Sequence, residues 1–132
     1  MKVLADTSAW VEFLRRTGSP VALAMRRRLD ADEVATTEMV MMEVLAGTTD
    51  ASRLERAERA LNACTYYPQR RLLDAQLAAS LYRDCRQAGE TPRQLTGCLI
   101  AVVAMRNRVA ILERDRDFDV LARHSSLQVV SG

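Results

Sequence analysis

The chain has 132 residues, of which 48% are hydrophobic and 27% are charged, and its formal net charge is +2. That length suits one domain and is too short for two, and the apolar content lets a core form without disulfides or a structural metal. No apolar run approaches the roughly 20 residues of a membrane span, and Asp6 interrupts the N-terminus too early for a secretory leader, so we expect a soluble cytoplasmic protein.

Short apolar runs alternate with segments of helical periodicity along the whole chain. In chain order the first half predicts a strand at 3–5, a helix behind the capping run at 6–8, a helix at 20–30 behind Ser19-Pro20, a strand at 34–35, a helix from the Thr36-Thr37 cap to Gly47, a helix around 54–61 and an edge strand at 65–67.

The second half predicts an amphipathic helix at 72–82 with Leu73, Leu77, Leu81 and Cys85 in one stripe, a helix from Thr91-Pro92 to about Met105, a strand at 109–112, a short helix at 117–123 and a last strand at 127–130. This alternation is typical of an α/β fold with a mostly parallel sheet, whose active crevice lies beyond the carboxyl ends of the strands.

Three acids follow predicted strands, and a fourth lies on an apolar helix. Asp6 follows the first strand, and Asp115 and Asp117 follow the strand at 109–112; each alone could simply cap a helix or turn. Glu43, surrounded by Met and Val, is either at the exposed edge of its helix or held inside by a partner. If the four converge, their mutual repulsion predicts a hard divalent cation, Mg²⁺ or Mn²⁺.

The cysteines, arginines and single histidine give little information about the functional site. Cys64, Cys85 and Cys98 have no metal-binding spacing, so we expect buried free thiols. Eighteen of the 19 basic residues are arginines, which suits phosphate contacts, but a GC-rich genome would give the same bias and is the favoured explanation. The single histidine, His124, leaves no material for a histidine-based metal site.

At this point the sequence resembles the PIN-domain toxins of the VapC type. The resemblance is carried by Asp6-Thr7-Ser8-Ala9-Trp10, Met42-Glu43-Val44-Leu45-Ala46-Gly47, Gly89-Glu90-Thr91-Pro92-Arg93 with Cys98-Leu99-Ile100-Ala101, and Arg114-Asp115-Arg116-Asp117-Phe118, in the family's order and spacing across the whole chain. It implies a single PIN domain over 1–132, folded as an α/β/α sandwich around a five-stranded parallel sheet.

The same resemblance implies a function and a site. The function is Mg²⁺- or Mn²⁺-dependent endoribonuclease activity on tRNA or other structured RNA, in a homodimer that a VapB antitoxin neutralises. The acidic ligands carried over are Asp6, Glu43, Asp115 and Asp117. Thr7 and Ser8 correspond to hydroxyls beside the site, and Arg93 and Arg116 are weaker candidates for phosphate or antitoxin contacts.

One position departs from the family pattern. Gly97 stands where these toxins carry an Asp directly before Cys-Leu-Ile-Ala, and no acid between Glu90 and Glu113 replaces it. Either a neighbour packs so closely that only glycine fits, or a metal ligand has been lost. The second reading predicts a folded protein with severely reduced cleavage, and leaves open a PIN domain that binds RNA or antitoxin without cutting.

A phosphotransfer or phosphatase domain that uses Asp6 as nucleophile is a third possibility. Such domains pair the strand-end Asp with a second Asp two residues on or with a lysine late in the chain. Here residue 8 is Ser8, and no lysine follows Lys2. The sequence therefore gives this function little support.

Overall fold

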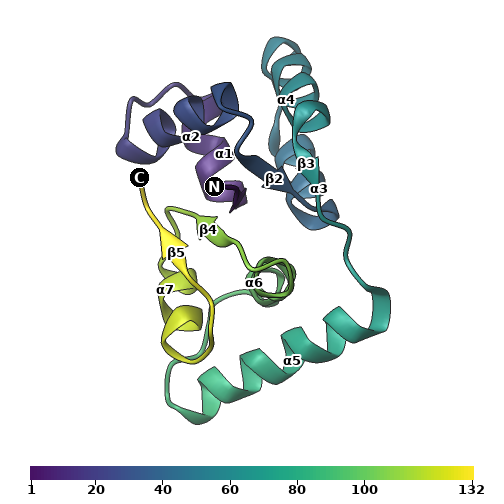
Figure 1. The fold of residues 1–132 in the computed structure, drawn as a ribbon, viewed down its shortest axis with the longest axis vertical. Helices are drawn as coiled ribbons and strands as arrows, with labels where there is room; N and C mark the ends of the chain where they lie inside the picture. Colours follow the sequence, from purple (N-terminus) through teal and green to yellow (C-terminus); the bar gives the residue numbers. More distant parts are fainter.

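The computed structural model describes residues 1–132 (Figure 1). Its elements are β1 (Val3–Ala5), α1 (Thr7–Leu14), α2 (Pro20–Asp30), β2 (Val34–Thr36), α3 (Glu38–Gly47), α4 (Ala51–Ala63), β3 (Thr65–Tyr66), α5 (Arg71–Gln87), α6 (Leu95–Arg106), β4 (Ala110–Leu112), α7 (Arg116–Arg123) and β5 (Val129–Val130). None of the helices is long and apolar enough to cross a membrane.

The five strands form one sheet in the order β3-β2-β1-β4-β5, and every neighbouring pair is parallel. β1 is central: the chain leaves it in one direction through β2 and β3, then returns to its other side through β4 and β5. The register pairs Val3 with Val34 on one side and with Ala110 on the other. The predicted parallel α/β sheet is confirmed.

Helices cover both faces of the sheet. α1 packs against α2, α3 and α4, and α6 packs against α5 and α7. In Figure 1 the first group lies above the strands and the second group below them. This is the predicted α/β/α sandwich.

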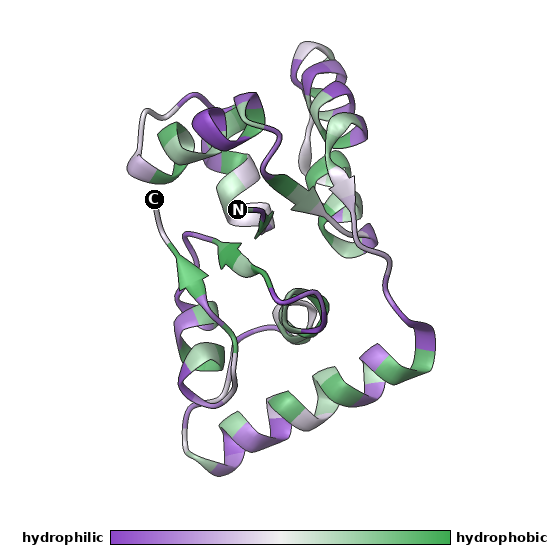
Figure 2. Ribbon diagram, in the orientation of Figure 1, coloured by the Kyte–Doolittle hydropathy of each residue, from purple (hydrophilic) through white to green (hydrophobic).

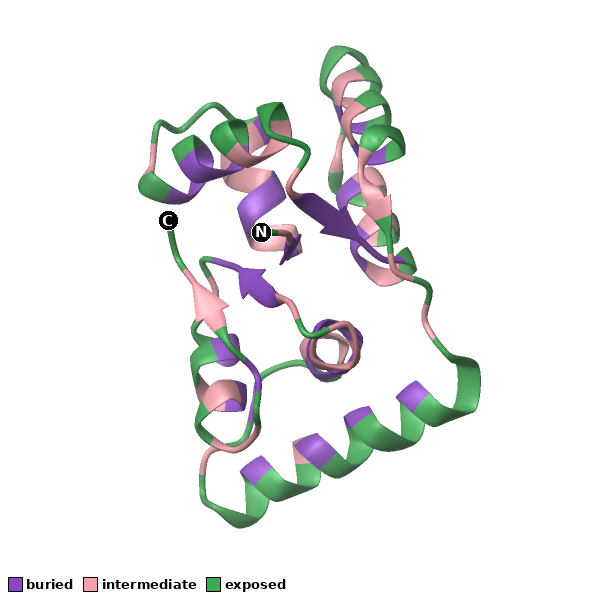
Figure 3. Cartoon of the chain, viewed as in Figure 1, coloured by how far each residue is buried: buried purple, intermediate pink, exposed green.

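The three central strands of the sheet form the middle of the core. All residues of β1, β2 and β4 are buried; the arrows of β2 and β4 are largely green, for hydrophobic, in Figure 2 and purple, for buried, in Figure 3. Trp10 and Phe118 are the largest fully enclosed side chains, one from each helical layer. Cys85 and Cys98 are buried and Cys64 is half-buried, all as free thiols, as predicted.

Two sequence predictions about helices need correction. α6 begins at Leu95 and not at Thr91-Pro92, because the Asp117 carboxylate accepts the N–H groups of Arg93 and Gln94 and holds this segment extended. On α5, Leu73 and Leu77 are 46% and 45% exposed, so the predicted apolar stripe faces the core only at its C-terminal half.

The buried face of α5 contains an acid in place of those leucines. Asp74 is fully buried, accepts the Arg70 N–H at 2.7 Å and forms an ion pair with Arg106 at the end of α6. Arg106 also donates to the Pro68 carbonyl at 2.7 Å. The buried carboxylate is tolerated because each of its two oxygens has a partner: one accepts the Arg70 N–H, and the other pairs with the Arg106 guanidinium.

Candidate active site

The topology creates a crevice between β1 and β4. The chain leaves these neighbouring strands toward opposite edges of the sheet, so the loops that follow them separate at their carboxyl ends. Asp6 directly follows β1, and the segment 113–117 directly follows β4. The two groups of strand-end acids predicted from the sequence therefore meet at one place.

Asp6 has two roles at the start of α1. As the helix N-cap it accepts the Ser8 N–H at 3.0 Å and the Ser8 hydroxyl at 2.8 Å. Burial raises the pKa of the Asp6 carboxyl above its usual range, the charge of Asp115 adds to that rise, and the Ser8 hydrogen bonds oppose it. Asp6 is thus positioned rigidly beside another carboxylate.

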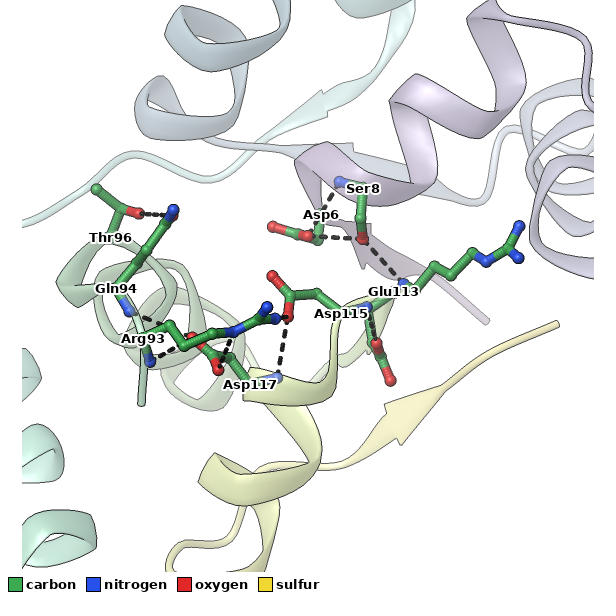
Figure 4. A network of polar contacts seen from close by, with 9 residues as sticks. Asp6, Ser8, Arg93, Gln94, Thr96, Glu113, Asp115 and Asp117 are labelled. Atoms are coloured by element: carbon green, nitrogen blue, oxygen red, sulfur yellow. Dashed lines mark hydrogen bonds and ion pairs between the residues drawn. The ribbon is translucent and has the colours of Figure 1, made fainter. Parts of the chain in front are cut away.

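The Ser8 hydroxyl also joins the two loops of the crevice. While it donates to Asp6, it accepts the N–H of Arg114 at 2.9 Å (Figure 4). Thr7, the neighbouring residue, donates its hydroxyl to the Glu43 carboxylate at 2.9 Å. The predicted auxiliary hydroxyls of Thr7 and Ser8 therefore orient two of the candidate acids. Glu43 is half-buried with a partner, which decides between the alternatives that the sequence left open.

Asp115 and Asp117 are joined by an arginine from the segment before α6. The Arg93 guanidinium donates to Asp115 at 2.6 Å and to Asp117 at 3.2 Å (Figure 4). Asp117 also accepts the backbone N–H groups of Arg93 at 2.8 Å and Gln94 at 3.2 Å. Asp115 caps α7 by accepting the Asp117 N–H at 3.0 Å.

These acids line one cleft of about 440 Å³. Asp6, Glu43, Asp115 and Asp117 all contribute to its wall, together with Thr7, Ser8, Gln94, Thr96 and Gly97. Arg116 does not line it and is exposed on α7. In this arrangement no three His, Cys, Asp or Glu side chains are grouped so that they could hold a metal ion.

The donor set nevertheless has the chemistry that Mg²⁺ or Mn²⁺ prefers. All four acids offer carboxylate oxygens, and no histidine or thiol lines the cleft. Each carboxylate is currently bonded to a protein donor: Asp6 to Ser8, Glu43 to Thr7, and both late acids to Arg93. The residues therefore fit a hard cation chemically. To coordinate such an ion, the carboxylates would have to turn away from these protein donors.

The sequence matches the PIN-domain family over residues 3–124. The chain belongs to the PIN-domain family. Within it the chain is of the VapC type: it is 43% identical to Ribonuclease VapC11 of Mycobacterium tuberculosis and to a VapC ribonuclease of Mycobacterium bovis, over 131 residues that cover 98% of each chain.

Solved structures share the PIN-domain fold. The DNA-bound VapBC complex of Salmonella typhimurium matches with a TM-score of 0.74 at 16% identity, over 98% of this chain and 97% of that one. VapBC-5 of Mycobacterium tuberculosis matches with a TM-score of 0.65 at 20% identity, over the same shares. At these identities the likeness concerns the fold alone.

The PIN-domain cleft has room for a side chain at Gly97. A Cβ there would meet only two ring carbons of Phe118, at 3.8 and 3.9 Å, which is ordinary van der Waals contact. Gly97 lies in the first turn of α6 and lines the cleft beside the acids. Close packing against a Cβ therefore does not explain the glycine.

Sequence reasoning missed several residues of this PIN-domain site. Gln94 and Thr96 line the cleft, and Arg114 does so while forming an ion pair with Glu12. Only the position of Arg114 beside Asp115 gave any signal. Glu113 was also missed: it is 4% exposed, accepts the Asp115 N–H at 2.5 Å and lies between two loops of acids.

Glu113 makes the stability of the domain depend on pH. Burial raises its pKa from 4.5 to about 7, and the charges of Asp119 and Asp6 add to the rise. A carboxyl that binds its proton more tightly in the folded state stabilises the fold below pH 4.5, and that contribution is lost as the pH rises toward 7.

We expect Glu113→Gln to stabilise the domain at pH 8 by on the order of 1 kcal/mol, after allowing for solvent screening, and to change little at pH 5. The amide keeps an acceptor for the Asp115 N–H. Urea unfolding of both proteins at the two pH values measures this difference. An effect of the same size at both values would refute the assignment.

Asp117 anchors the segment that precedes α6. Both of its oxygens accept N–H donors, and the residue is 7% exposed. Asp117→Asn turns one acceptor into a donor facing those donors, so we expect a loss of about 2 kcal/mol in unfolding free energy. Asp84→Asn, at an exposed acid of α5 without an ion pair, is the control and should cost nothing measurable. Equal losses in the two variants would contradict this role.

Proposed function

We propose that this PIN domain is a VapC-type toxin, a divalent-metal-dependent endoribonuclease that cleaves tRNA or other structured RNA. The observation that carries the proposal is the convergence of Asp6, Glu43, Asp115 and Asp117, from three separate parts of the chain, on one cleft. The names of its 43%-identical relatives, which are ribonucleases, support the same activity.

The chain's own residues would prepare the reaction in defined ways. Asp6, Glu43, Asp115 and Asp117 would hold the ion, and Asp117 also positions the start of α6. A bound Mg²⁺ or Mn²⁺ supplies an activated water and stabilises the charge on the departing oxygen. Ser8 and Thr7 hold Asp6 and Glu43 at the wall of the cleft, and both carboxylates would turn from these donors to take up the ion. Arg93, once released from Asp115, is placed to contact a phosphate.

The glycine at position 97 supports a second candidate function, a PIN domain that binds without cutting. With this position lacking its acid, and with no three acids grouped for a metal, the chain would bind RNA or an antitoxin and turn over slowly or not at all. We therefore propose strongly impaired cleavage for the chain as it stands.

We also propose a VapB-type antitoxin as partner and a homodimer as the assembled form. The structural neighbours, which are VapBC toxin-antitoxin structures, support the antitoxin. A cytoplasmic location would place the domain beside its RNA.

The direct test is to measure RNA binding and RNA turnover side by side. Purified tRNA is incubated with the chain in Mg²⁺, Mn²⁺ or EDTA, and binding is followed by fluorescence anisotropy. Slow metal-dependent cleavage supports the nuclease, and tight binding without cleavage supports the binding module. Neither binding nor cleavage, for tRNA or total RNA, would contradict both.

A further inference from the structure

A second hollow adjoins the acidic cleft on the side of α1. It measures about 110 Å³ and lies between α1, α3 and the start of α4. Val11 and Glu43 line both this hollow and the cleft, so the two are adjacent. Its basic residues are Arg15, at the end of α1, and Arg53, on α4.

A third and larger hollow measures about 610 Å³. Arg16 lines it next to Arg15, and Arg56 lines it one helical turn after Arg53. Arg26 of α2 lines its far wall. Both hollows lie on the α1, α2 and α4 side of the fold. We call their arginines, Arg15, Arg16, Arg26, Arg53 and Arg56, the arginine track.

The positive charge of the track is largely unneutralised. Among its five arginines only Arg53 has a carboxylate within ion-pair distance, Asp50 at 4.0 Å. Arg56 instead donates to the Leu14 carbonyl at 3.0 Å and lies over the Phe13 ring. Burial lowers the pKa of Arg56, and the charges of Arg16 and Arg53 lower it further. These like charges are therefore close together, and an anion would relieve their repulsion.

We propose that the arginine track binds the phosphodiester backbone of the RNA on one side of the bond to be cut. This rests on the proposed ribonuclease function and names the surface that holds its substrate. The cleft itself is lined by carboxylates and repels phosphates, so a polyanion needs cations close by. Arginine forks bind phosphate oxygens well. The track supplies five of them in two hollows, and the smaller hollow shares part of its wall with the cleft.

RNA fits the track better than an acidic protein segment does. Phosphates recur at every nucleotide, so one strand can meet arginines spread over two successive hollows while its next phosphate enters the cleft. An acidic peptide could also pair with the arginines, but it has no phosphodiester for the adjacent carboxylate cleft to act on. Binding of such a peptide in place of RNA is therefore treated as an outcome of the test.

The test is the affinity of a fluorescein-labelled single-stranded RNA of mixed sequence, measured by anisotropy in EDTA at several salt concentrations. The triple variant Arg15→Gln, Arg26→Gln, Arg53→Gln removes exposed charges only. The matched control Arg71→Gln, Arg83→Gln, Arg86→Gln removes the same charge from α5, on the opposite side of the fold (Figure 1). Circular dichroism checks that both fold.

We expect the track variant to bind RNA at least about 10-fold more weakly, with the slope of log affinity against log salt smaller by about 0.7 for each arginine removed. The control should keep most of the affinity. Equal losses in both variants, or none in the track variant, overturn the proposal, as does loss of binding to a poly-glutamate peptide with RNA affinity intact. If one of these outcomes is found and a Gly97→Asp protein still cleaves RNA, the ribonuclease proposal stands and only the proposed role of the arginine track is wrong.

Discussion

Gly97→Asp is expected to raise metal-dependent RNA cleavage by about 10²-fold over the chain as it stands, because misplacement of reacting groups costs rates of that order. The new carboxylate would project from the first turn of α6 into the cleft that holds Asp6 and Asp115. A Cβ at this position would make only ordinary van der Waals contact with Phe118. Initial rates on tRNA in Mn²⁺ measure the gain.

Two matched variants separate ligand chemistry from packing. Gly97→Ala adds only the Cβ and should leave cleavage unchanged. Gly97→Asn adds the shape of aspartate without its charge and should recover only a small part of the rate. If alanine raised cleavage as much as aspartate, the effect would belong to the helix and not to a ligand.

Asp6→Asn, introduced into the Gly97→Asp protein, is expected to abolish cleavage, with a loss of about 10³-fold or more, since an acid of the metal site acts on the transition state directly. The amide oxygen can still accept the Ser8 N–H, so α1 keeps its cap and the domain should remain folded. Thermal unfolding checks this condition.

Asp50→Asn is the control for that substitution. Asp50 caps α4 by accepting the Ser52 N–H at 3.3 Å, the same role that Asp6 has for α1, but it lies outside the cleft. We expect full cleavage from the control. Retained cleavage in Asp6→Asn would remove Asp6 from the catalytic set.

Local signals predicted most of the fold. Buried strands such as Val3–Ala5 appear as short apolar runs, and Ser19-Pro20 marks the start of α2 at the residue where the structure begins it. Alternation then implied a parallel sheet, and the crossover rule directed attention to the strand-end acids. The meeting of Asp6 with Asp115 was predictable for this reason.

Long-range polar contacts were not predictable. The sequence near residues 91–94 carries no signal that the Asp117 carboxylate accepts the N–H groups of Arg93 and Gln94. The predicted start of α6 was therefore too early. The burial of Asp74 depends on its ion pair with Arg106 of another helix. Asp74 therefore faces the core at the start of α5, whereas periodicity alone places Leu73 and Leu77 there. Such pairings arise from tertiary packing, which overrides local periodicity.

The central claim is that acids from separate elements form one divalent-ion site, and calorimetric titration with Mn²⁺ tests it most directly. We predict weak single-site binding to the chain as it stands, binding tighter by about 10-fold in Gly97→Asp because ligand charge sets affinity, and no binding in Asp6→Asn. Binding of equal strength in all three proteins, or in none, would contradict the claim.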